Sequence, residues 1–145
     1  MPKRRKFSIY ERGVVAQRAN ECCEYCISQA DYSSETFEME HILPLSLGGN
    51  NDLGNLAHSC SGCNGRKRDK IGAIDPRTGQ IAPLFNPRLH IWENHFIWRE
   101  DFTIIEGISP TGNCTVALLE LNRKGVVNLR KALRIIGDHP PPQML

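Results

Sequence analysis

Apolar and polar side chains alternate along the segment Thr36 to Leu43, which reads TFEMEHIL. An alternation with a period of two residues is typical of a β-strand with one buried face. Pro44 should end this strand, and a turn-rich stretch at 48–52, GGNND, follows it. Residues Leu53 to Ser59 can then supply a short second strand. The two faces of the first strand would carry Phe37, Met39 and His41 on one side and Glu38, Glu40 and Ile42 on the other.

Three other segments carry patterns typical of helices. Ser8 and Glu11 can form a capping box, in which each side chain bonds the backbone of the other, and a helix should follow to about Asn20. A second helix is expected from Ser61 to about Ile74. Asn122 can cap a last helix. The apolar positions of that helix, at helical spacing, are Val126, Leu129, Leu133 and Ile136.

The region before the last helix is expected to form a β-hairpin. Phe102 to Ile108 and Thr115 to Leu121 both read as strands, and Ser109 to Gly112, SPTG, reads as the turn that joins them. A chain of 145 residues is normally one domain. We therefore expect a single α+β domain over residues 1–145. Its core would lie at 22–74 and a C-terminal extension, a β-hairpin plus a helix, at 75–145.

The net charge is only +2, but the basic residues are clustered. Clusters of this kind fit a polyanionic ligand such as nucleic acid, although for any one cluster alone a solvated surface is the more common explanation. The three clusters are Lys3, Arg4, Arg5 and Lys6; Arg66, Lys67, Arg68 and Lys70; and Arg123, Lys124, Arg130, Lys131 and Arg134. No apolar run approaches the roughly 20 residues of a membrane span. The basic N-terminus has no apolar stretch after it, as a secretory signal would, so we expect a cytoplasmic protein.

The cysteines change this picture most. In a reducing compartment, paired cysteines bind metal more often than they form disulfides. Cys23 and Cys26 form one CxxC pair, and Cys60 and Cys63 form a second. Together they predict a four-cysteine structural zinc site, with Zn–S bonds of about 2.3 Å. A redox pair or plain buried thiols are the alternatives. We expect the remaining Cys22 and Cys114 to be ordinary thiols.

A strand, a loop, a strand and a helix, with cysteine pairs before and inside them, resemble the HNH nuclease family, whose core is a ββα-metal finger. The resemblance covers roughly Cys23 to Lys67, and the segments PLFNPR and HF, Pro83 to Arg88 and His95-Phe96, look like a C-terminal extension of some bacterial members. It implies a zinc-stapled HNH core within the α+β fold. The matching elements are Cys23-x-x-Cys26, Glu40-His41, Pro44, Gly48-Gly49, Asn55-Leu56, Cys60-x-x-Cys63, Asn64 and Lys67.

The resemblance implies a set of catalytic residues. His41 would be the general base, because imidazole can accept a proton from water near neutral pH. Glu40 and Asn64 would bind a divalent ion, Mg²⁺ or Mn²⁺, through oxygen atoms. Adjacent strand residues point to opposite faces, so the strand must end or twist at Glu40 and His41 for both to serve one phosphate. Asn55 would bridge the loop and orient His41. Each of the four also has an ordinary explanation when it is considered without its neighbours. His41 could be a packed histidine, Glu40 a solvated strand residue, Asn64 a helix cap and Asn55 a turn residue.

The resemblance also implies a nucleic-acid partner. The helix with Arg66, Lys67, Arg68 and Lys70 would lie along the backbone, with Lys67 on a phosphate. We expect DNA to be bound through its backbone with weak sequence specificity. The alternatives are a catalytically inactive zinc-knuckle module that binds nucleic acid, and a protein-interaction adaptor. A symmetric homodimer would allow two strands to be cut, but the sequence does not fix the oligomeric state. His58 is expected to be a surface residue.

Overall fold

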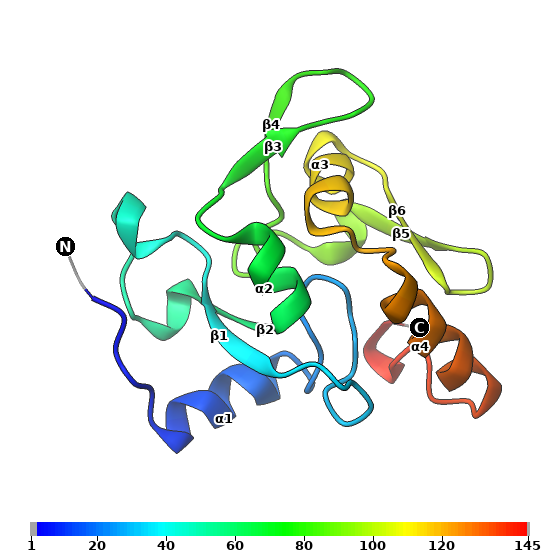
Figure 1. Ribbon diagram of the computed structural model, residues 1–145, viewed down its shortest axis with the longest axis horizontal. Coiled ribbons are helices and arrows are strands. Elements are labelled where there is room, and N and C mark those ends of the chain that lie inside the picture. The colour runs from blue at the N-terminus through cyan, green and yellow to red at the C-terminus, as the bar shows by residue number, and fades with distance from the viewer. Residues whose placement is uncertain (1–2, 145) are drawn as a thin grey trace.

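The computed structural model describes residues 3–144, and its regular elements are short. Figure 1 shows helix α1 at one end of the molecule, the β1, β2 and α2 unit beside it, and the C-terminal elements at the other end. The strands pair as three two-stranded antiparallel sheets. The elements are α1 Ile9–Arg18, β1 Phe37–His41, β2 Leu56–Cys60, α2 Ser61–Lys67, β3 Gly72–Ile74, β4 Ile81–Pro83, β5 Phe96–Arg99, β6 Ile104–Gly107, α3 Pro110–Leu119 and α4 Lys124–Ile135.

The predicted strand–loop–strand–helix unit is present. Strand β1 pairs with β2 in a register that sets Phe37 opposite Cys60 and His41 opposite Leu56. The expected helix from Ser61 to Ile74 was too long, since α2 ends at Lys67. Arg68 takes a positive φ of 54°, which leaves the helical region, and the chain beyond it enters the β3–β4 hairpin.

The loop between β1 and β2 requires glycine at two adjacent positions. Gly48 has a φ of +94°, in the left-handed region that favours glycine. At Gly49, a Cβ atom would lie 1.9 Å from the carbonyl oxygen of Leu43. The pair therefore folds the loop tightly back onto the end of β1, where His41 is located.

Helix α1 begins as the sequence predicts. The Glu11 amide donates to Ser8 Oγ at 3.1 Å, and the Ser8 amide donates to Glu11 Oε1 at 3.0 Å. The helix ends at Arg18, slightly before the expected Asn20. Its inner face packs on the β1–β2 unit through a small apolar cluster of Phe7, Val15, Met39 and Leu56.

The predicted hairpin partner Thr115 to Leu121 was wrong. This segment lies mainly in helix α3, and the C-terminal hairpin pairs β5 with β6 instead. Ser109 caps α3 by accepting a hydrogen bond from the Gly112 amide at 2.9 Å, and Pro110 occupies the first turn. Serine before proline thus marks a helix start here, where the sequence had suggested a turn.

The last helix is present, with a different start. Arg123 occupies the cap position of α4. The side chain of Asn122 instead holds β6, accepting from the Ile105 amide at 2.7 Å and donating to the Ile105 carbonyl at 2.8 Å. On the predicted apolar face, Val126 and Leu133 are buried, Leu129 is half-buried and Ile136 is exposed.

The main hydrophobic core joins the zinc-knuckle region to the C-terminal elements. Phe85 stacks edge-on against Tyr25, with ring centroids 6.4 Å apart, and against Phe96 at 5.3 Å. Phe96 also packs on Trp92 at 5.0 Å. The PLFNPR and HF segments therefore supply Phe85 and Phe96, which pack in the same core as Tyr25 of the zinc-knuckle region. Within residues 3–144, no helix is both long and apolar enough to cross a membrane.

Candidate active site and metal centre

The two CxxC pairs meet in space. The sulfur atoms of Cys23, Cys26, Cys60 and Cys63 all lie within 4.8 Å of one another, and all four residues are buried. The Sγ atoms of Cys26 and Cys60 are 3.7 Å apart. A tetrahedron with metal–sulfur bonds of about 2.3 Å has sulfur–sulfur edges of about 3.8 Å, so the set fits zinc. Cys22 and Cys114 lie outside this cluster.

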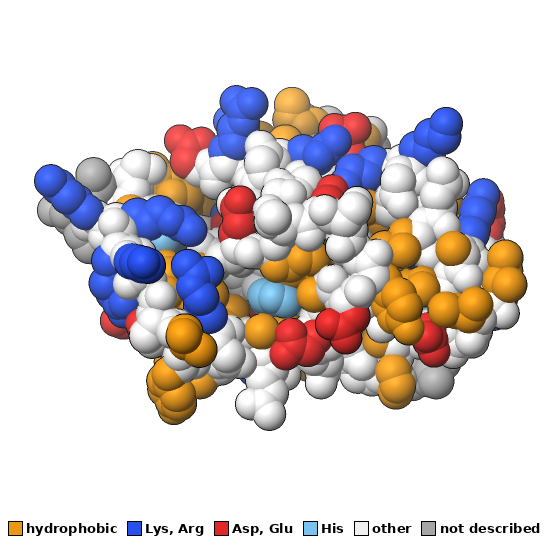
Figure 2. All heavy atoms as spheres, turned by 60° about the horizontal axis from the view of Figure 1, so that its bottom comes forward, with side chains coloured by type: hydrophobic (Ala, Val, Ile, Leu, Met, Phe, Trp, Pro, Cys, Tyr) orange, Lys and Arg blue, Asp and Glu red, His pale blue; other side chains and the backbone are white. Residues whose placement is uncertain are grey.

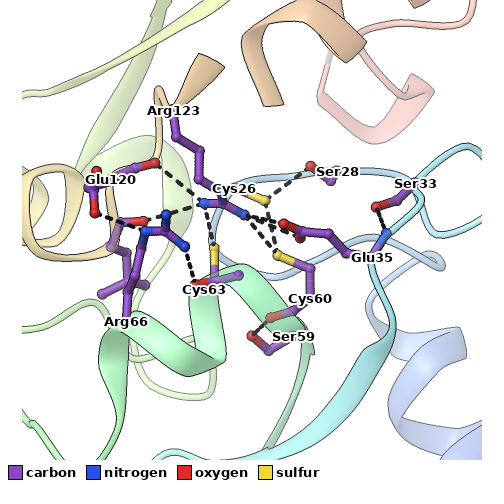
Figure 3. Close-up of polar contacts among 12 residues, drawn as sticks. Cys26, Ser28, Ser33, Glu35, Ser59, Cys60, Cys63, Arg66, Glu120 and Arg123 are labelled. Atoms are coloured by element: carbon purple, nitrogen blue, oxygen red, sulfur yellow. Dashed lines mark hydrogen bonds and ion pairs between the residues drawn. The ribbon is translucent and has the colours of Figure 1, made fainter. Parts of the chain in front are cut away.

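Arg123 from the start of α4 covers the cysteine cluster (Figure 3). Its Nη1 lies 3.5 Å from Cys63 Sγ and its Nη2 lies 3.3 Å from Cys60 Sγ. Glu35 pairs with the same guanidinium at 3.3 Å. Burial alone would lower the pKa of Arg123, but the charge of Cys63 and a hydrogen bond to it raise that pKa overall. The guanidinium would thus offset the negative charge of four thiolates if they bind a zinc ion.

A small pocket of about 210 Å³ joins three of the four predicted catalytic residues. His41 is the last residue of β1 and Asn64 lies in α2, so two elements of the finger meet here. Because β1 ends at His41, the adjacent Glu40 and His41 both reach the pocket. The lining residues are Arg4, Glu40, His41, Pro44, Leu45, Asn64, Arg68 and Asp69.

The two ring nitrogens of His41 have different partners. Nδ1 lies 3.2 Å from Arg4 Nη1, and Nε2 lies 2.9 Å from Asn51 Oδ1. A guanidinium can only donate hydrogen bonds, so Nδ1 is the acceptor and Nε2 carries the proton. The Asn51 amide agrees, because its Nδ2 donates to the Lys3 carbonyl and leaves Oδ1 for His41.

The charge state of His41 follows from its surroundings. Burial lowers its pKa from the ordinary value of 6.5. The hydrogen bond with Asn51 acts in the opposite direction, while the positive charges of Arg4 and Lys67 lower the pKa further. The ring is therefore neutral at neutral pH, and the electron pair on Nδ1 accepts the hydrogen bond from Arg4.

Glu40 is buried, and both of its oxygens have close neighbours. Tyr25 donates its hydroxyl to Oε2 at 2.6 Å, and Lys67 Nζ lies 2.7 Å from Oε1. Burial raises the pKa of Glu40, and Lys67 and Tyr25 oppose that rise. Oε1 is nevertheless buried without an aligned hydrogen bond within residues 3–144. Its close partner is the Lys67 ammonium, which balances the negative charge of the carboxylate.

The geometry corrects the expectation that Lys67 contacts a phosphate. Its side chain is only 2% exposed. Besides the ion pair with Glu40, its ammonium donates to the Ile42 carbonyl at 3.0 Å and to the His41 carbonyl at 3.4 Å. Lys67 therefore stabilises the end of β1 from the protein interior.

Asn64 lines the pocket, and its amide oxygen is available as a hydrogen-bond acceptor. Its Nδ2 donates to Glu38, on the same strand face as Glu40, and no hydrogen bond to Oδ1 occurs in the part of the chain described. Amide and carboxylate oxygens suit a hard cation. Glu40, Asn64 and Asp69 therefore line the pocket with oxygen-bearing side chains that could bind a divalent ion. Glu38 was not singled out from the sequence, although its alternation with Glu40 placed both on one face.

Asn55 bridges the β1–β2 loop, as expected, but does not touch His41. Its Nδ2 donates to the carbonyls of Leu43 and Asn50 at 2.9 Å each, and its Oδ1 accepts from the Leu43 amide at 2.9 Å. Orientation of His41 instead comes from Arg4 and Asn51. Sequence reasoning missed both in this role, although Arg4 lay in a basic run and Asn51 in the turn.

The other residues of the second basic cluster divide between two sides of the molecule. Arg66 pairs with Glu120 at 2.9 Å, near the cysteine cluster (Figure 3). Arg68 and Lys70 are exposed, and Arg68 lines the pocket. Figure 2 shows Lys and Arg side chains gathered around a histidine at the end of the molecule that carries the N-terminal segment.

Arg130 of the third basic cluster and His58 have structural roles. Arg130 is buried and donates to carbonyls, among them Cys26 at 3.1 Å and Leu121 at 2.7 Å. His58 is buried too, which corrects the expected surface position. Its Nδ1 lies 2.9 Å from the Cys22 carbonyl, and its ring packs on Phe37 at 4.8 Å.

Comparison with known proteins agrees with this geometry. The chain is 30% identical to the Septu protein PtuB of Bacillus thuringiensis over 116 residues, or 79% of this chain, and spans 42% of that relative's length. No solved structure matches the chain significantly. The HNH endonuclease family matches at residues 23–77, a range that contains all four clustered cysteines and the pocket residues Glu40, His41 and Asn64. Residues 23–77 of this chain therefore belong to the HNH endonuclease family.

Proposed function

We propose that this protein is a metal-dependent endonuclease that hydrolyses phosphodiester bonds in DNA. The pocket that joins Glu40, His41 and Asn64 is the observation that carries this proposal. Around this space lie the neutral imidazole of His41, the side chains of Glu40 and Asn64, and the exposed guanidinium of Arg68. A general base, a site for a cation and positive charge for the substrate are the parts that phosphodiester hydrolysis requires.

His41 is the general base in this proposal. A water molecule beside Nδ1 gives up a proton to the ring while its oxygen attacks phosphorus. The bond from phosphorus to the departing ester oxygen breaks, and that oxygen takes a proton from solvent. Asn51 accepts a hydrogen bond from Nε2 at 2.9 Å and keeps the proton there, so Nδ1, which Arg4 contacts in this structure, is the basic nitrogen.

Glu40 and Asn64 would hold Mg²⁺ or Mn²⁺. The bound ion would offset the phosphate charge and stabilise the departing oxygen. With one buried carboxylate and one neutral amide, the protein supplies few ligands, so metal affinity should be weak without DNA. Lys67 opposes the rise in the Glu40 pKa that burial causes, and it holds the carboxylate at 2.7 Å.

Zinc in the four-cysteine cluster would have a separate, structural role. The cluster ties the segment before β1 to the start of α2. A finger of this size buries too little core to be stable alone. The zinc ion would therefore hold the elements that carry His41 and Asn64 at a fixed separation, without contact with the substrate.

Cleavage of supercoiled plasmid tests the proposal. We expect nicked or linear DNA with Mg²⁺ or Mn²⁺, and loss of that activity in His41→Ala. A matched control is His90→Ala, since His90 lies outside this pocket and should be dispensable. If no divalent ion supports cleavage while DNA is still retarded on a gel, the protein is an inactive zinc-knuckle binding module. Equal cleavage by wild type and His41→Ala would refute the role of His41.

A further inference from the structure

Arg4 of the N-terminal segment lines the catalytic pocket. Its guanidinium lies 3.2 Å from Nδ1 of His41, the proposed general base. We propose that Arg4 is a substrate-contacting residue that covers His41 Nδ1 in the free protein and moves to a DNA phosphate when substrate binds. This inference rests on the proposed nuclease function and adds a residue outside the 23–77 family match.

The segment is anchored on both sides of Arg4. On one side, Phe7 is buried in the cluster with Val15, Met39 and Leu56, directly before the α1 capping box. On the other side, the Lys3 carbonyl accepts a hydrogen bond from Asn51 Nδ2 at 3.0 Å. Arg4 itself is held in place, because its Nη2 donates to the Met39 carbonyl at 3.0 Å.

Arg4 occupies the position that the attacking water needs. Its Nη1 lies 3.2 Å from His41 Nδ1, the only ring nitrogen with an available electron pair. A water molecule must take this hydrogen bond before it can lose a proton to the ring. Cleavage therefore requires the guanidinium to leave Nδ1, although the rest of the segment can stay bound.

A phosphate is a better partner for Arg4 than a neutral imidazole is. Hydrogen bonds between a guanidinium and an anionic oxygen are charge-assisted and often bidentate, so they are about twice as strong as neutral ones. Arg4 is exposed, and its partners in the free protein, the His41 ring and the Met39 carbonyl, are both uncharged. A phosphate that enters the pocket can therefore replace His41 as the partner of Arg4. This exchange leaves Nδ1 of His41 free to accept a proton.

DNA affinity measured in a His41→Ala background distinguishes two roles of Arg4: contact with a phosphate, and support of the His41 ring. We would measure the affinity of a short DNA duplex with Mg²⁺ for His41→Ala and for His41→Ala with Arg4→Ala. The first variant already lacks the histidine, so a residue that only holds His41 has no effect here. A phosphate contact predicts weaker binding by severalfold, with a log–log salt slope smaller by about 0.9.

Cleavage kinetics supply the second readout. Arg4→Ala should lower kcat by about 10²-fold, as expected for loss of a charge-stabilising donor, and Arg4→Lys should restore part of it. Lys6→Ala, in the same basic run but exposed and outside the pocket, is the matched control and should leave kcat unchanged.

The outcomes are distinguishable. If wild type cleaves DNA and Arg4→Ala cleaves as fast or faster, with unchanged duplex affinity in the inactive background, Arg4 is only a cover and the inference is overturned. The nuclease proposal would survive that result. If wild type does not cleave at all, the nuclease proposal fails, and with it the inference.

Discussion

Replacement of Lys67 by methionine should destabilise the protein strongly. Lys67 and Glu40 form an ion pair at 2.7 Å in which each side chain is 2% exposed. Methionine preserves most of the side-chain volume but leaves the Glu40 carboxylate buried without a positive charge. It also removes the donor to the carbonyls of Ile42 and His41.

The magnitude follows from the burial of the pair. Removal of one partner from a buried ion pair costs about 3–5 kcal/mol, because the remaining charge loses its compensation. Replacement of both partners by neutral groups of similar size costs much less. Lys67→Met combined with Glu40→Gln should therefore be more stable than the sum of the single changes predicts, by about 3 kcal/mol, near the upper limit for contacting residues.

Urea unfolding of zinc-loaded protein measures these free energies directly. The four proteins of the double-mutant cycle would be unfolded under identical conditions, with zinc content checked in each. Arg68→Met is a suitable control, since Arg68 is exposed in the same segment and should change stability by less than about 0.5 kcal/mol. A loss below about 1 kcal/mol for Lys67→Met, or additive effects in the cycle, would refute the buried ion pair.

Three further changes test other parts of the structure. Because the pKa of His41 lies below 6.5 and the neutral ring is the base, the cleavage rate should rise with pH to a plateau, with its midpoint below pH 6.5; a midpoint above that value would contradict the assignment. Arg123→Ala should speed zinc loss to a chelator by about 10–100-fold, measured with a zinc-sensitive dye, and an unchanged rate would show that the guanidinium does not stabilise the thiolates. Gly49→Ala should cost about 3 kcal/mol by overpacking, and more than Gly54→Ala in the same loop, where the added Cβ meets no atom within 4 Å; similar costs would disprove the close approach of the loop.

The sequence was sufficient for features that depend on local spacing. The CxxC pairs and the capping box each involve residues a few positions apart, and their chemistry restricts the geometry. The alternation around Glu40 predicted β1 correctly for the same reason. Thr115 to Leu121 failed because its β-branched residues suggest a strand, whereas Ser109 and Pro110 begin a helix in which Thr115 is fully buried.

Contacts between distant segments could not be predicted. The sequence suggests that Lys67 is a surface cation. In the structure it lies beside Glu40, 27 positions earlier, and both side chains are buried. Arg4 reaches His41 across a separation of 37 residues. Burial and pairing of this kind depend on tertiary packing. The prediction from the basic clusters therefore counted buried cations such as Lys67 and Arg130 as residues that face a ligand.

A crystal structure of His41→Ala with Mn²⁺ and a short DNA duplex would test the central claim most directly. Anomalous scattering distinguishes manganese from zinc. We expect zinc on the four cysteines, Mn²⁺ bound to Glu40 and Asn64, and a DNA phosphate between that ion and Arg4. A duplex bound on another face, with no Mn²⁺ at Glu40 and Asn64, would contradict the assignment of this pocket as the site of cleavage.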